Sequence, residues 1–156
     1  MELLITLRLI HIVLGALWVG MMAFTVFFLT PAVRDAGPDG AKVMAALQRR
    51  GVMTVMPIIA LLTIASGVWL IQRVYGGMAS LMATRTGVTL TAGAVASLIA
   101  FLLGILVMRP AMVRAAASSD PAEVQRLRAR GAAVGRVVAS LLIFAVAAMA
   151  VARYVG

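Results

Sequence analysis

Few side chains in this sequence could do chemistry, and His11 is the first of them. It is the only histidine among 156 residues, and the chain has no cysteine. Imidazole is a ligand for haem iron and for copper. One histidine supplies one ligand, so a methionine or a second subunit would have to supply another. His11 follows Arg8 by about one helical turn, where a hydrogen bond to another helix also satisfies an imidazole. We expect this structural role, with haem or copper binding as the alternative.

The methionines are the second group of potential ligands. The chain has eleven of them, and thioether sulfur is a soft donor that suits Cu(I). Met78 and Met82 are four residues apart and fall on the same predicted side of the membrane as His11. Methionine is also a common filler of irregular gaps in apolar cores. His11, Met78 and Met82 are therefore the candidate metal ligands, with core packing as the alternative for the methionines.

The acidic residues argue against catalysis. All five of them lie outside the long apolar runs: Glu2, Asp35, Asp39, Asp120 and Glu123. A proton relay or cation pathway through a membrane usually needs an intramembrane carboxylate. Paired-carboxylate catalysis and a Ser-His-Asp triad need an acid beside the reacting groups. The sequence thus predicts a protein that is not an enzyme.

Four apolar runs must position these residues. Hydrophobic residues make up 63% of the chain and charged residues 12%, against about 45–50% and about 25% in soluble domains. The runs cover about 4–30, 52–74, 87–108 and 133–154, and each is long enough to cross about 30 Å of hydrocarbon. They are continuous rather than alternating in polarity. We predict a single all-α domain over residues 1–156, with four transmembrane helices arranged as two hairpins in a bundle.

The charged residues predict the orientation of this bundle. Ten basic residues lie in segments 31–51 and 109–136, and four lie elsewhere. The positive-inside rule then places both longer loops in the cytoplasm and both termini outside. The same topology explains the net charge of +9. No stretch combines a basic patch with interleaved aromatic residues, so we expect no binding to nucleic acid.

The two cytoplasmic loops are similar to each other. The first runs from Pro31-Ala32 to Gly51 and the second from Pro110-Ala111 to Gly131. Each is expected to contain a short amphipathic helix. Gly131 is expected to end the second of these in the left-handed conformation. The similarity suggests one hairpin used twice.

Helix packing explains a further set of residues. Trp18 lies about ten residues in from Arg8, or about 15 Å deep at 1.5 Å per residue, which is too deep for an interfacial belt. Small side chains let helices approach closely in lipid. The predicted packing residues are Gly15, Trp18, Gly20, Thr63, Gly67, Gly93 and Ser97.

A resemblance to a known family adds to this. The family pattern comprises His11, Trp18-Val19-Gly20, Pro31-Ala32, Arg49-Arg50-Gly51 and Ser66-Gly67. It resembles small bacterial four-helix proteins related to the CopD-like copper-resistance membrane domain, best over residues 8–75. The resemblance implies an integral helical bundle in the bacterial inner membrane, and it singles out His11 for copper or haem.

The residue pattern and the family resemblance together suggest a function. We expect a non-catalytic integral membrane protein, a structural or accessory subunit that packs against a larger membrane complex. Its partners would be the lipid bilayer and other membrane subunits or a second copy of the chain, with no cofactor. The alternative is a copper- or haem-handling membrane protein with His11 as ligand.

Overall fold

The computed structural model describes residues 1–155, and helices account for nearly all of them. Residues 1–155 contain no strand. The elements, in chain order, are α1 (Glu2–Phe24), η1 (Thr25–Leu29), α2 (Thr30–Asp35), α3 (Gly37–Arg49), α4 (Val52–Tyr75), α5 (Met78–Met82), α6 (Arg85–Leu103), η2 (Gly104–Met108), α7 (Arg109–Ala117), α8 (Pro121–Val151) and η3 (Ala152–Tyr154). The segments η1 and η2 are π-helical, and η3 is a 3-10 turn.

Four helical segments are long and apolar enough to cross a membrane. They are Glu2–Asp35, Val52–Tyr75, Arg85–Ala117 and Pro121–Tyr154. The prediction of an all-α, four-span bundle is therefore confirmed. Three of these segments are 33 or 34 residues long, or about 50 Å at 1.5 Å per residue. They exceed the roughly 30 Å of hydrocarbon, so part of each segment lies beyond the apolar layer.

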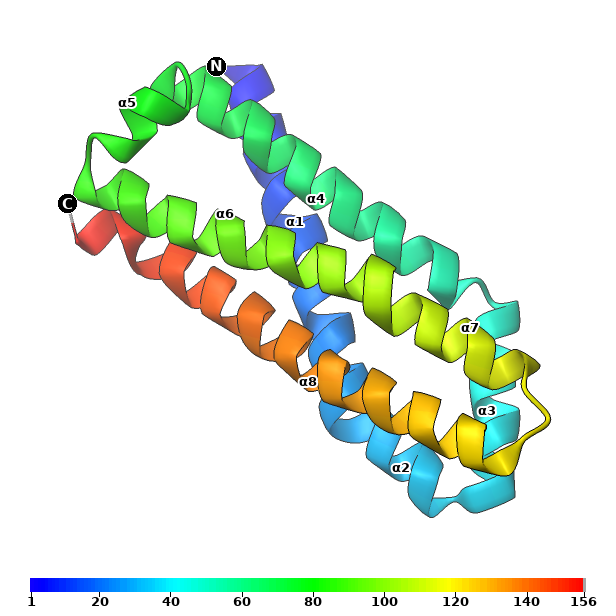
Figure 1. The fold of residues 1–156 in the computed structure, drawn as a ribbon. Coiled ribbons are helices and arrows are strands. Elements are labelled where there is room, and N and C mark those ends of the chain that lie inside the picture. Colours follow the sequence, from blue (N-terminus) through cyan, green and yellow to red (C-terminus); the bar gives the residue numbers. More distant parts are fainter. Residues whose placement is uncertain (156) are drawn as a thin grey trace.

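The four segments form two antiparallel hairpins. Helix α1 packs along α4, and α6 packs along α8. Both chain ends and α5 lie at one end of the bundle, whereas α2, α3 and the turn from α7 to α8 lie at the other (Figure 1). The hairpins meet where α1 contacts α8 and where α4 contacts α6. The basic loops thus share one end of the molecule, and His11 is nearer to the other.

The loop helices differ between the hairpins. In the first hairpin α3 is a separate helix, and Gly51, in the left-handed conformation at φ +80°, separates it from α4. In the second, Oδ1 of Asp120 accepts from the backbone N–H of Ala122, and the helix begins at Pro121. It then continues through Gly131 to Val151, so the expected end at Gly131 was wrong. Gly131 is buried, and a Cβ there would lie 3.9 Å from the Met112 side chain. It serves the packing of α7 on α8.

The predicted repeat of the hairpins has a structural counterpart. Each π-helical segment contains five residues and is followed, at the second position, by a proline: Pro31 after η1 and Pro110 after η2. Proline has no N–H and clashes with the preceding turn, so a helix that continues through it must widen or bend. The same irregularity occurs at the same place in both hairpins, which supports an internal repeat.

Candidate functional site: the His11 contact and the core around Trp18

His11 links α1 to α4 through hydrogen bonds. Its Nδ1 lies 2.9 Å from the backbone carbonyl oxygen of Thr63 and 3.3 Å from Oγ of Ser66. A carbonyl oxygen only accepts, so Nδ1 must carry the proton and donate it. The Ser66 hydroxyl in turn lies within bonding distance of the carbonyl oxygens of Leu62 and Thr63. The only imidazole of the chain is thus held in one tautomer by a polar patch on α4.

A glycine makes room for the imidazole. A Cβ added at Gly67 would lie 2.8 Å from Cε1 of His11, closer than a side-chain carbon tolerates. One turn deeper, a Cβ added at Gly15 would lie 3.5 Å from Cγ2 of Thr63, which is an ordinary contact. Thr63 and Ser66 are buried, and the Thr63 hydroxyl donates to Ile59 within its own helix. His11, Gly15, Thr63 and Gly67 therefore form one contact between α1 and α4.

The second ring nitrogen of His11 is the one available for a ligand. Both hydrogen bonds of the ring use Nδ1, and no side-chain nitrogen or oxygen in residues 1–155 is buried without a partner. The half-buried ring therefore leaves Nε2 at the surface of the helix pair. Metal-binding histidines commonly donate their other N–H to a carbonyl oxygen, as Nδ1 does here. This nitrogen could ligate a metal without disturbing the contact with α4.

The other candidate ligands, Met78 and Met82, lie on a different helix from His11. Residues 1–155 contain no cluster of three or more histidine, cysteine, aspartate or glutamate side chains that could hold a metal ion. Met78 and Met82 lie on the short α5 between the hairpins, and both are about half exposed. Their thioethers are on a different element from His11. Among the histidine, cysteine, aspartate and glutamate side chains of residues 1–155, His11 is therefore not part of a cluster that could hold a metal ion.

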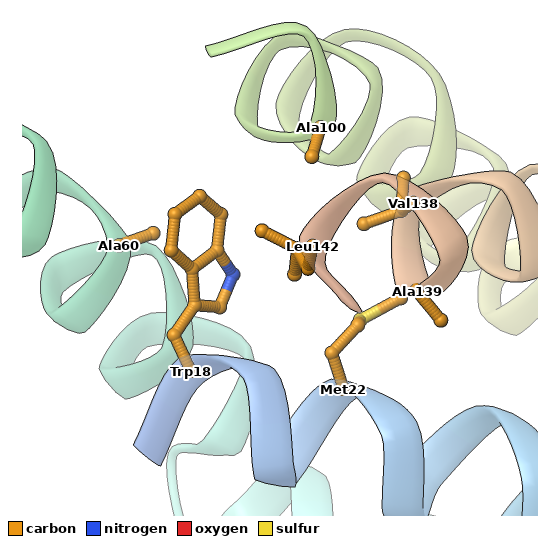
Figure 2. Close-up of a cluster of buried hydrophobic side chains, with 7 residues drawn as sticks. All are labelled: Trp18, Met22, Ala60, Ala100, Val138, Ala139 and Leu142. Atoms are coloured by element: carbon orange, nitrogen blue, oxygen red, sulfur yellow. The ribbon is translucent and has the colours of Figure 1, made fainter. Parts of the chain in front are cut away.

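Trp18 lies in the core between the hairpins. Its indole is only 5% exposed and sits between Ala60 of α4 and Leu142 of α8, with Ala100 of α6 beyond the ring (Figure 2). Met22, one turn further along α1, reaches Ala139. One large ring packed against two alanines and a leucine thus contacts the other three spans from α1.

The other predicted packing residues differ in their surroundings. Gly93 is buried, and a Cβ there would lie 3.1 Å from the backbone carbonyl oxygen of Ala145, so α6 and α8 approach closely at this point. Ser97 is half-buried, and its hydroxyl donates to the Gly93 carbonyl oxygen. Gly20 is exposed, and no described atom lies within 4 Å of a Cβ built on it. Among residues 1–155, no helix therefore packs against Gly20.

A cavity beside Trp18 was not foreseen from the sequence. Its volume is about 70 Å³, and residues from all four spans line it, including Trp18, Met22, Met53, Met56, Met108 and Arg109. The signal available in the sequence was the number of methionines in the second and third spans. Methionine spacing alone does not distinguish a filled core from a lined cavity, because the same flexible side chain suits both.

Comparison with known proteins finds no matching family model, no similar curated protein and no similar solved structure.

Proposed function

We propose that this multi-pass membrane protein is a non-catalytic accessory subunit. It would pack through the outer face of α1 against a transmembrane helix of a larger complex in the bacterial inner membrane. The outward position of Gly20 is the observation that carries this proposal. Among residues 1–155, no atom outside its own helical turn lies within 4 Å of a Cβ built on Gly20, and Ala16, one turn earlier, is also exposed. Two small residues at this spacing form a shallow notch into which a second helix fits closely in lipid.

Aromatic side chains at the end of α1 and in η1 extend this exposed face. Phe24 and Phe28 are stacked, with ring centroids 6.2 Å apart and an angle of 25° between the ring planes, and both are more than half exposed. A lipid-facing helix needs only apolar side chains. A notch at Ala16 and Gly20 followed by a preformed aromatic pair has the shape complementarity that a partner helix can use.

The lack of a complete chemical site supports the non-catalytic part of the proposal. Each acid of the basic end already has a partner: Asp35 lies 3.5 Å from Arg34, Asp39 lies 2.7 Å from Lys42, and Glu123 accepts from Ser118 at 2.7 Å. Asp120 caps α8. These four acids also lie at the end of the bundle away from His11, whose hydrogen bonds go to Thr63 and Ser66.

Cross-linking from α1 tests the accessory role. A photoreactive residue in place of Ala16 should yield one defined cross-linked membrane protein in cells. The same residue in place of Ala147, an exposed alanine of α8, should not. Gly20→Leu fills the notch and should abolish the cross-link from position 16, while Ala147→Leu should leave it intact. Equal labelling from positions 16 and 147, or a cross-link that survives Gly20→Leu, would contradict the proposal.

The orientation proposed for the bundle places the basic loops in the cytoplasm. Ten basic residues at that end against four elsewhere support this. Exposed Trp69 and Tyr154 lie toward the opposite end, where interfacial rings are favoured. Single cysteines in place of Lys42 and Ser119 should resist an impermeant thiol reagent in intact cells, and one in place of Met78 should react. The opposite pattern would reverse the orientation.

Copper or haem handling, with a likeness to CopD-like proteins, is the second candidate function. The donation from Nδ1 of His11 to the Thr63 carbonyl oxygen favours it, since this arrangement presents Nε2 to a metal. The accessory role predicts a colourless, metal-free purified protein. A haem absorption band or stoichiometric copper that disappears in His11→Gln would establish the second candidate instead.

A further inference from the structure

The cavity beside Trp18 has a closed floor and a half-open side. Its floor consists of buried side chains from α1, α4, α6 and α8, namely Trp18, Met22, Ala60, Ala100 and Val138. Its rim consists of half-exposed residues: Met53 and Met56 on α4, and Ile105 and Met108 on η2. The cavity therefore faces outward between α4 and η2, at a depth where a membrane protein is surrounded by lipid chains.

The walls of this cavity suit a flexible apolar chain. All of the lining residues except Arg109 are apolar. Methionine thioethers adapt to the shape of what they contact. A volume of about 70 Å³ has room for roughly five water-sized groups, since one such group needs about 10–15 Å³ by this measure. A segment of one hydrocarbon chain fits, whereas both chains of a lipid do not.

The backbone on one side of the cavity is irregular. Gly104 and Met108 begin and end the π-helical segment η2, and both line the cavity. No described atom lies within 4 Å of a Cβ built on Gly104, so space remains beside it. A π-helical turn widens the helix locally and is common at binding sites. The irregularity before Pro110 thus helps keep this side of the bundle open.

The charged residue Arg109 lies at the end of the cavity nearest to the basic loops. Arg109 lines the cavity and is exposed, and it makes no ion pair or side-chain hydrogen bond with residues 1–155. The two acids of α2 and α3 form ion pairs with other residues, Asp35 with Arg34 and Asp39 with Lys42. Arg49 and Arg50 lie three and two residues before Val52, which lines the same cavity from α4. The positive charge here has no counterpart within the described chain.

We propose that this cavity is a binding site for one anionic phospholipid. One acyl chain would lie against Met53, Met56 and Met108, and the headgroup phosphate would pair with Arg109. A guanidinium binds phosphate through two parallel hydrogen bonds. A zwitterionic lipid carries its own cation beside the phosphate, so it gains less from an uncompensated arginine. The apolar cavity and the unpaired cation together select an anionic amphiphile, and the membrane supplies one at high local concentration.

Trp18 provides a direct reporter for this site. The chain has two tryptophans, so Trp69→Phe leaves the indole on the cavity floor as the only one. This variant would be reconstituted in phosphatidylcholine vesicles containing a minor fraction of brominated-chain phosphatidylglycerol or, in parallel, brominated-chain phosphatidylcholine. Bromine atoms quench indole fluorescence only at close range. The anionic lipid should be preferred by about fivefold, which is the effect of one basic side chain near a membrane surface.

Two variants assign the preference to Arg109. Arg109→Gln should remove it, and Arg85→Gln, at the opposite end of the same continuous helix, should retain it. Unbrominated phosphatidylglycerol should relieve the quenching in the unaltered site, and unbrominated phosphatidylcholine should do so about fivefold less well. This competition needs no change at Arg109, so it decides the question even if Arg109→Gln fails to fold. Equal quenching by both lipids, no quenching, or a preference that survives Arg109→Gln would overturn the proposal.

Discussion

The two helices of each hairpin contact each other in different ways in the two hairpins of this bundle. Each has a glycine at a close approach of its helices, Gly67 in the first and Gly93 in the second. At Gly67 the space is filled by the imidazole of His11, which bonds to the α4 backbone at Thr63. At Gly93 it is filled by the backbone of α8, whose Ala145 carbonyl oxygen would lie 3.1 Å from an added Cβ.

The difference separates two sources of helix association in lipid. Hydrophobic burial does not favour one helix pair over another in a membrane, so packing and hydrogen bonds must do so. The first hairpin uses a directional polar bond that can be lost while the helices stay in place. The second uses close backbone packing, which an added side chain disrupts directly. The core around Trp18, where the hairpins meet, belongs to neither and should be the most sensitive point.

Removing the ring that joins the hairpins should have the largest effect. Trp18→Ala leaves a cavity next to Leu142 and two alanines, Ala60 and Ala100, whose side chains are too small to fill it. Truncations of this size cost about 3–5 kcal/mol in soluble proteins. The purified variant should show a much lower melting temperature in detergent. Trp69→Phe, at an exposed position, is the control and should change little. An unchanged melting temperature for Trp18→Ala would show that the hairpins do not depend on this contact.

Filling the space at the second hairpin should have the next largest effect. Gly93→Val places two methyl groups against the Ala145 carbonyl oxygen and the Met149 side chain. Overpacking of this kind costs about 1–3 kcal/mol. Gly20→Val is the matched control, because it makes the same change inside a helix where no described atom is near. Comparable melting temperatures for the two variants would mean that α6 and α8 separate readily, and the comparison of the hairpins would then fail.

The sequence predicted the parts of the fold that hydropathy encodes. Continuous apolar runs and loop charges were sufficient for four spans in two hairpins, and the depth of Trp18 was sufficient to expect a packed environment. The end of a helix was harder to place. Gly131 has the residue type of a helix end, but Met112 packs over it and α8 continues. Tertiary contact outweighed the local signal there.

The site residues show the same limit. Gly15 and Gly20 are both glycines of one helix, yet only Gly15 lies against another helix. Their spacing of five residues places them on different faces, and the sequence does not say which face the neighbour covers. The bond partner of His11 was equally out of reach, because Thr63 contributes its backbone carbonyl oxygen rather than its side chain. Every residue has a backbone carbonyl oxygen, so the residue type does not indicate which one accepts the hydrogen bond.

The smallest effect should come from loss of the hydrogen bond between His11 and Thr63 in the first hairpin. A double-mutant cycle with Gly67 measures this contact more specifically than a single variant. Interhelical hydrogen bonds in a membrane protein average about 0.6 kcal/mol, so His11→Ala should lower the melting temperature slightly and still fold. Gly67→Ala alone places a Cβ 2.8 Å from Cε1 of His11, so the ring must shift and its bond to Thr63 weaken. With His11→Ala already present, the clash is gone and Gly67→Ala should be neutral or stabilising, since alanine favours a helix over glycine by about 1 kcal/mol. The melting curves of the four proteins should therefore show that the two substitutions are not additive. The double variant should be more stable than the sum of the two single effects predicts. Additive effects would mean that the imidazole does not occupy the space at Gly67. The proposed difference between the two hairpins, a hydrogen bond in the first and close backbone packing in the second, would then be wrong.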